Sequence, residues 1–246
     1  MRRRKPQFGV VATCLFAVLC LTIRADVEPA SQPSTSASSS QAADWFAMSP
    51  DEFAQSTDAK RELPWEGIDD RLLSAAILHE TNRYRVEHSL PALRHMPGVD
   101  EVAAMHAVDM SQGGWFGHDH PTDPKKRTVF DRAELAGLRP MFVAENLVME
   151  YGIRYEPGRK VYETTRRGRD GLSYRPHGEP IPRHTYQSFA KRVVERWIDS
   201  PPHRENIGSK YPKFMGAAAR PGRSEDEVRF QKFYVVQVLF SPLPVR

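Results

Sequence analysis

The chain has 246 residues, and 40% of them are hydrophobic, which is enough to bury the core of one large domain or two small ones. Of its 35 basic residues, five lie in residues 1–24 with no acidic residue among them, which leaves 30 basic against 31 acidic side chains, so overall charge gives no sign of a face that binds nucleic acid. Both cysteines, Cys14 and Cys20, also lie there, so the rest of the chain can form no disulfide, thiolate zinc site or cysteine nucleophile.

Residues 1–25 are predicted to be a signal peptide or an N-terminal anchor. Arg2–Lys5 form a positively charged start, and an unbroken apolar run of sixteen residues follows from Phe8 to Ile23. This length suits a secretory leader and is short for a membrane span, which needs about 20 residues. We therefore expect an exported protein that is secreted, periplasmic or at the cell surface, and that contacts the membrane only through an uncleaved leader.

Residues 26–69 are predicted to be a linker that is rich in serine and proline and contains a short amphipathic segment. Residues 30–43 hold almost no large apolar side chain, which predicts a flexible tether. Ser49–Glu52 is typical of a helix start, with Ser49 as N-cap, proline at the first position and glutamate at the third. We expect the large apolar side chains around it to dock on the flank of the folded domain, and a partner-binding motif is the alternative: Trp45, Phe46, Met48 and Phe53.

Residues 70–246 are predicted to form one domain. Apolar residues recur at helical spacing in four segments, which we expect to be helices: 70–88, 99–113, 128–138 and 186–200. Strand signals occur in three segments, the last of which is apolar on nearly both faces, as in a covered strand: 141–150, 214–219 and 228–240. Helices gathered around a few late strands indicate an α+β fold with a small antiparallel sheet between helical layers.

A basic insertion interrupts this pattern at about residues 151–185. It holds eight arginine and lysine residues against four acidic ones. We expect a long surface loop, of the kind that is usually functional or mobile.

Three clusters in the domain contain residues suited to chemistry. His118 and His120 form a His-x-His pair that could hold a metal ion from a strand with Asp119 in support, although surface histidines in a loop are the alternative. Glu145 lies in an apolar strand, where an unpaired carboxylate is costly, so it requires a histidine or backbone N–H groups as partner. Residues 200–207 predict a tight turn that could fix the direction of His203.

The other histidines are expected to be structural or solvent-facing. His106 lies on the inner stripe of a predicted helix and is expected to be a hydrogen-bonded core side chain, whereas His79, His88 and His95 are expected to face solvent. The sequence contains no His-Glu-x-x-His motif, no nucleophile elbow and no phosphate-binding glycine loop.

Taken together, these segments resemble the CAP superfamily of cysteine-rich secretory, antigen 5 and pathogenesis-related-1 proteins, in its bacterial secreted form with an SCP domain. The resemblance covers residues 70–241 and rests on motifs that occur in this order: Thr81–Arg85, Leu90–Leu93, Ala103–Met110, Trp115–His118, Ala144–Leu147, Trp197–Ile207 and the strand Phe233–Phe240.

The resemblance implies an α-β-α sandwich with a cavity lined by histidines and acids, in which His118 and His203 can hold a divalent ion such as zinc. It places His118, Glu145 and His203 in the cavity. Ser200 stands where many eukaryotic members have the second acid, and Asp199 beside it is expected to point elsewhere on the helix. Six further polar residues of the motifs Ala144–Leu147 and Trp197–Ile207 are candidates for ligand binding: Asn146, Asp199, Ser200, Arg204, Glu205 and Asn206.

We favour a binding or interaction module for a lipid, glycan or protein ligand over an enzyme, because a fold does not carry a function by itself. The alternative is a protease-like, metal-assisted hydrolase in which His118 and His203 hold the ion and Glu145 orients a histidine or the attacking water. Two protein ligands predict modest zinc affinity.

Overall fold

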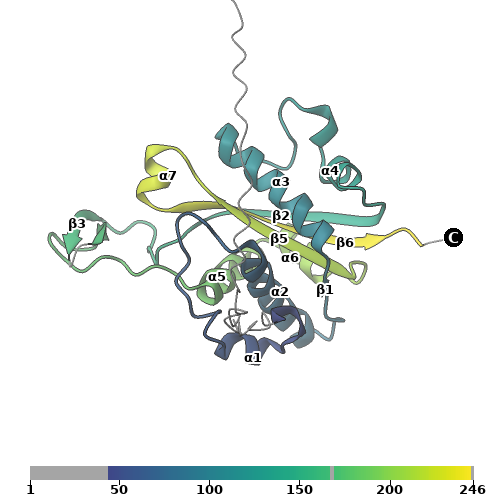
Figure 1. The fold of residues 1–246 in the computed structure, drawn as a ribbon, viewed down its shortest axis with the longest axis horizontal. Helices are drawn as coiled ribbons and strands as arrows, with labels where there is room; N and C mark the ends of the chain where they lie inside the picture. Colours follow the sequence, from purple (N-terminus) through teal and green to yellow (C-terminus); the bar gives the residue numbers. More distant parts are fainter. Residues whose placement is uncertain (1–43, 167–168, 245–246) are drawn as a thin grey trace, which may run out of the picture. The chain divides into compact units, whose positions relative to one another are not determined.

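The structure is a computed structural model that describes residues 44–166 and 169–244 (Figure 1). The predicted leader and the tether at residues 30–43 lie outside the described residues. Among those described, no helix is long and apolar enough to cross a membrane. The helices are α1 Pro50–Gln55, α2 Asp70–Glu87, α3 Pro97–Gly113, α4 Val129–Leu135, α5 Tyr186–Asp199, α6 Pro201–Gly208 and α7 Glu225–Arg229, with short 3-10 turns η1 Trp45–Ala47 and η2 Pro124–Lys126. The strands are β1 Arg94–His95, β2 Pro140–Tyr151, β3 Tyr162–Arg166, β4 Arg169–Ser173, β5 Phe214–Pro221 and β6 Lys232–Pro242.

Four strands form the central sheet, in the order β1-β5-β6-β2. The pairs β5–β6 and β6–β2 are antiparallel, as expected, but β1 adds a two-residue parallel pair to β5, so the sheet is mixed rather than antiparallel. Strand β6 lies between β5 and β2, and its residues from Phe233 to Ser241 are all buried, which explains its nearly continuous apolar sequence. Strand β2 lies at the edge of the sheet.

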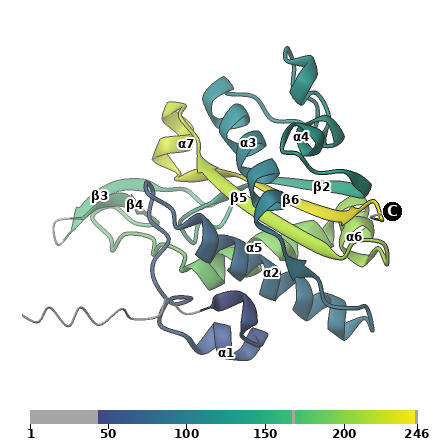
Figure 2. The same cartoon turned by 45° about the vertical axis from the view of Figure 1, so that its right-hand side comes forward.

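Helices cover both faces of this sheet, which confirms the predicted α-β-α sandwich (Figure 2). Alternate residues of β6 enter two different cores. Phe233 and Val235 pack with α2 and α5, whereas Tyr234 and Val236 pack with α3 and α4. On the second face α3 approaches β5 so closely that a Cβ atom on Gly216 would lie 2.3 Å from the Asp100 nitrogen, which explains glycine at this position.

The four predicted helices and three predicted strands occur at their expected places, with two corrections. Residues 201–208 form helix α6 instead of a tight turn, because Pro201 and Pro202 stop α5 and also occupy the first turn of a new helix, where no backbone N–H is required. Residues 225–229 form α7, capped by Ser224, so the last strand begins at Lys232 rather than at Val228.

The segment 44–69 packs on the folded domain. Ser49 and Glu52 form the expected reciprocal cap of α1. Phe53 is 1% exposed and belongs to the core with α2, and Trp45, Phe46 and Met48 pack against the same core. These side chains therefore dock on the domain's own flank, as expected.

This N-terminal segment also overturns two expectations about histidines. His79 is buried because the Phe53 ring stacks on it at 4.5 Å and the Trp45 carbonyl oxygen lies 2.7 Å from its Nε2 atom. His95 is covered by the Phe46 ring at 3.6 Å and pairs with Asp100. His88 is exposed, as expected.

The basic insertion contains a β-hairpin, whereas the sequence analysis expected a long surface loop. Strands β3 and β4 form an antiparallel hairpin, and a small core of Ile153, Leu172 and Ile181 supports it. The hairpin was not predicted, because the burial of its few apolar residues depends on contacts between segments that are distant in sequence.

Replacing Phe53 by alanine tests whether the N-terminal segment stabilises the domain. We expect the Phe53→Ala variant to lose about 3–5 kcal/mol of unfolding free energy in urea, because a buried ring is removed from the core. Phe130→Ala, at a side chain that is 44% exposed, is the matched control and should change it by less than about 0.5 kcal/mol. A loss in Phe53→Ala as small as that expected of the control would show that the Phe53 ring does not contribute to the core.

Candidate functional site

The predicted site residues lie on the edge strand β2 and on the two segments that flank it. The loop after α3 holds His118, β2 holds Glu145, and α6 holds His203. The structure brings these three together: the His118 Nδ1 atom lies 2.9 Å from Glu145 Oε1, and the centroids of the His118 and His203 rings are 6.5 Å apart.

Glu145 has the partner that its place in an apolar strand requires, and a second that the sequence analysis missed. Arg132 of α4 donates from Nη2 to Glu145 Oε2 at 2.7 Å, and both side chains are almost completely buried, at 0% and 2% exposure. The same guanidinium donates to the carbonyl oxygens of Lys126 and His118. This ion pair therefore joins α4, the loop that carries His118, and β2.

The signal that could have identified Arg132 is its helical spacing. It lies one position before the buried Ala133 and three after Val129, on the inner side of the predicted helix 128–138. An arginine at an inner position requires a buried anion, and Glu145 was the acid already recognised as lacking a partner.

His106 lies next to this ion pair as a core side chain, as expected. It is 0% exposed, and its Nε2 atom lies 3.0 Å from the Gly117 carbonyl oxygen and 3.7 Å from Glu145 Oε1. Burial lowers its pKa to about 4; the Glu145 charge opposes this shift and the Arg132 charge adds to it. His106 is therefore neutral at pH 7 and supports the loop that carries His118.

His118 and His203 face the outside of the ion pair. The His118 side chain is 56% exposed, with its Nδ1 held by Glu145 and its Nε2 free of that contact. Burial lowers the pKa of His203, and the neighbouring His118 adds to this shift. The two histidine rings thus lie side by side at the outer face of the ion pair.

A buried amide network places α6 against β2. Asn146 donates to the Gln237 side chain at 2.9 Å and to the His203 carbonyl oxygen at 3.3 Å. Asn206 donates to the Asn146 side chain at 2.9 Å and to the Glu145 carbonyl oxygen at 3.3 Å. Gln237 donates onward to Thr81 of α2 at 2.9 Å. Asn146 and Asn206 therefore hold α6, and with it His203, against β2.

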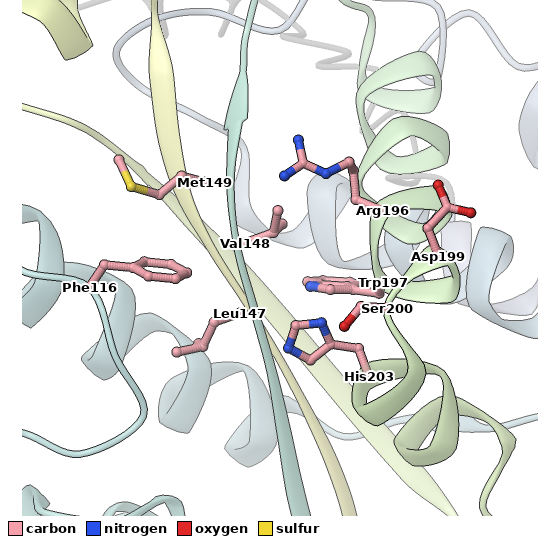
Figure 3. A pocket seen from close by; sticks show the side chains of 9 residues that line it. All are labelled: Phe116, Leu147, Val148, Met149, Arg196, Trp197, Asp199, Ser200 and His203. Atoms are coloured by element: carbon pink, nitrogen blue, oxygen red, sulfur yellow. The ribbon is translucent and has the colours of Figure 1, made fainter. Parts of the chain in front are cut away.

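A pocket of about 500 Å³ adjoins the imidazoles along the edge of β2 (Figure 3). Three of the predicted residues, Asp199, Ser200 and His203, line it, and for Asp199 this differs from the expectation that it would point elsewhere on the helix. The other lining residues were not predicted as site residues, although three of them belong to the matching motifs, because only the fold brings their loop, strand and helix together: Phe116, Leu147, Val148, Met149, Arg196 and Trp197. Figure 3 shows Phe116, Leu147 and Met149 on one side of β2 and Trp197 with His203 on the other.

The remaining candidates lie outside this pocket. Arg204 and Glu205 are exposed, and Arg204 donates to the Ile198 carbonyl oxygen at 2.9 Å. His120 accepts from the backbone N–H of Asp123 at 2.9 Å, so it shapes the loop. Asp119 is exposed near Arg127.

The side chains present do not make a resident catalytic zinc site. Such a site uses three protein ligands and an open position. Here two imidazoles converge, while the Glu145 carboxylate is engaged by Arg132 and His118. Within residues 44–166 and 169–244 no group of three or more histidine, cysteine, aspartate or glutamate residues could hold an ion.

The pKa of His106 predicts how stability changes with pH. The unfolded chain protonates His106 near pH 6.5, whereas the folded protein resists protonation until about pH 4. The unfolded state therefore binds more protons in this window, and the unfolding free energy should fall as the pH is lowered from 6.5 to 4. Urea titrations should show a shallower fall for His106→Gln, while His88→Gln, at an exposed position, should follow the wild type. If the unfolding free energy of His106→Gln fell with pH as steeply as that of the wild type, the lowered pKa of His106 would be contradicted.

Comparisons with solved structures find chains that are similar to parts of this one. They include an extracellular protein containing an SCP domain from Bacillus anthracis (21% identity, TM-score 0.44, 68% of this chain and 40% of that chain covered). An outer surface protein from Borrelia burgdorferi has 15% identity and a TM-score of 0.48 over 72% of this chain and 97% of that chain. A cysteine-rich secretory protein from Staphylococcus aureus has 11% identity and a TM-score of 0.40 over 72% of this chain and 41% of that chain. The chain thus spans less than half the length of two of these proteins.

No curated protein sequence matches the chain significantly. A family model described as the cysteine-rich secretory protein family, CAP, matches residues 78–239, which run from α2 to β6 and make up more than half of the chain. The chain belongs to the cysteine-rich secretory protein (CAP) family.

Proposed function

We propose that this protein is an exported binding module and that its ligand occupies the pocket beside β2. The observation that carries the proposal is the combination of an open, largely apolar pocket with a neighbouring carboxylate that is already engaged. The pocket has about 500 Å³, in the range of small ligand sites, and combines the rings of Phe116 and Trp197 with a few polar groups. A lipid, a glycan or a segment of a protein are the ligand classes that it could take.

The state of Glu145 favours binding over hydrolysis. A general base must reach the proton that it abstracts, either directly or through one water. Glu145 is 2% exposed in its side chain, its Oε2 accepts from Arg132 and its Oε1 contacts His118. These contacts suit a structural role that orients His118, and they leave Glu145 itself without a free oxygen to act as the general base. Zinc binding by His118 and His203 stays a prediction, with the modest affinity of two ligands.

Export remains part of the proposal. The positively charged start and the apolar run of residues 8–23 are typical of a secretory leader. A ligand met outside the cytoplasmic membrane would be an external lipid, glycan or protein segment.

Ligand binding to the full chain can be tested with one probe from each class. Oleate, chitotriose and an extended heptapeptide serve as probes. Changes in the NMR chemical shifts of the protein show which residues each probe contacts. We expect one class to shift residues that line the pocket, and Phe116→Ala to weaken that binding at least about tenfold, because it removes one wall. Phe130→Ala is the control, since this ring is similarly exposed, 44% against 49%, but does not line the pocket.

The opposite result would be hydrolysis of a casein substrate by the wild type that is lost in Glu145→Gln without loss of folding. That outcome would favour the hydrolase. Binding of none of the probes at the pocket would also contradict the proposal.

A further inference from the structure

We propose that the pocket binds an extended peptide segment of a partner protein, which adds to the free edge of β2 as a further strand. This inference rests on the proposed function and names its ligand class. It follows from the main-chain groups at the floor of the pocket, from its two walls and from the charges along one wall.

The register of β2 and β6 determines which main-chain groups face the pocket. Gly152 N–H donates to the Gln231 carbonyl oxygen, and the pairs Glu150–Phe233, Val148–Val235 and Asn146–Gln237 continue this register at every second residue. In an antiparallel pair, residues in hydrogen-bonded positions direct their N–H and C=O groups toward the partner strand, which here applies to the even-numbered residues of β2. The odd-numbered residues of β2 direct theirs away from β6. Leu147 and Met149 therefore present their N–H and C=O groups at the open edge.

Two neighbouring contacts agree with this assignment. The Glu145 carbonyl oxygen accepts from Asn206 of α6, and the Tyr151 N–H donates to the Glu150 side chain, so both odd-numbered neighbours point away from β6. For Leu147 and Met149, no described residue outside the sheet supplies such a partner. Both residues line the pocket, although Leu147 is only 3% exposed, and in our proposal these main-chain groups face its interior.

The walls of the pocket admit a thin chain. Phe116 rises on one side of β2, and Trp197, Ser200 and His203 rise on the other (Figure 3). A single extended strand can lie between the walls and direct alternate side chains to each of them.

The free main-chain groups favour a peptide over a lipid. An acyl chain in the pocket would exclude water from the N–H and C=O groups of Leu147 and Met149 and offer no hydrogen bond in return. A peptide backbone supplies donors and acceptors at the spacing of the strand.

Charges on the α5 wall indicate which peptide fits. At the Met149 end, Arg192 and Arg196 lie 3.5 and 3.2 Å from the single carboxylate of Glu150, which leaves one positive charge in excess. About one turn further along α5, Asp199 lines the same wall. The complementary segment has an acidic side chain opposite Arg196, a basic one toward Asp199, and apolar side chains toward Phe116.

The test uses the full chain and the labelled peptide Val-Ser-Val-Glu-Val-Lys-Val, blocked at both ends, in which the acidic and basic side chains are two residues apart on one side of the strand. Fluorescence anisotropy measures affinity, and amide hydrogen exchange by NMR reports the edge. We expect binding to slow exchange at Leu147 and Met149 by about tenfold or more, and to leave Asn146 and Val148, which already pair with β6, unchanged. Arg196→Glu should weaken binding at least about tenfold. Lys191→Glu, the same charge change on the exposed face of α5, is the control.

A second measurement keeps the test independent of any folding defect in the variants. Two versions of the peptide are N-methylated at alternate residues, one at the valines and one at the residues between. One version should lose binding at least about tenfold and the other should retain it, because only one edge of a strand pairs with β2.

The outcomes separate the two proposals. Peptide binding that leaves exchange at Leu147 and Met149 unchanged, or that neither N-methylated version weakens, would overturn strand addition while the pocket remains a binding site. Binding of oleate or chitotriose at the pocket without peptide binding would do the same. Failure of all three probes would overturn both proposals.

Discussion

The buried ion pair between Arg132 and Glu145 is the interaction on which the site depends. An isolated charge in this core would be costly, and either partner alone would be left without compensation. Arg132 satisfies this requirement with one carboxylate and the carbonyl oxygens of the preceding loop. The pair thereby fixes the loop that carries His118 and Phe116 against the edge strand β2, although these segments are distant in sequence.

A second buried network completes the arrangement on the other side of β2. Asn146 and Asn206 join α6 to the sheet, and Gln237 connects them to α2. Glu145 and Asn146 are adjacent in one strand and point to opposite faces, so the Glu-Asn motif holds both walls of the pocket at once. The pocket is the space between these two anchored layers, with the free edge of β2 as its floor. A groove held on both sides by buried polar contacts agrees with the proposed binding of an extended ligand.

Much of the fold could be predicted because it depends on local periodicity. Helices α2, α3 and α5 and the covered strand β6 were predicted within a few residues from their apolar spacing, and the cap at Ser49 from its short motif. His118, Glu145 and His203 were grouped through the family resemblance. Burial of His79 could not be predicted, because it depends on Phe53 docking from a segment assigned to the linker. Arg132 was missed because its partner is supplied by another element. The pocket walls likewise follow from the order of the strands.

The measurement that tests this account most directly is a double-mutant cycle on Arg132 and Glu145, followed by urea unfolding. Arg132→Met and Glu145→Leu should each lower the unfolding free energy by about 3–5 kcal/mol, because each leaves a buried charge without its partner. The double variant should lose less than either single variant, since it buries no lone charge. Losses below about 1 kcal/mol for each single variant, adding simply in the double variant, would contradict the central role of this ion pair.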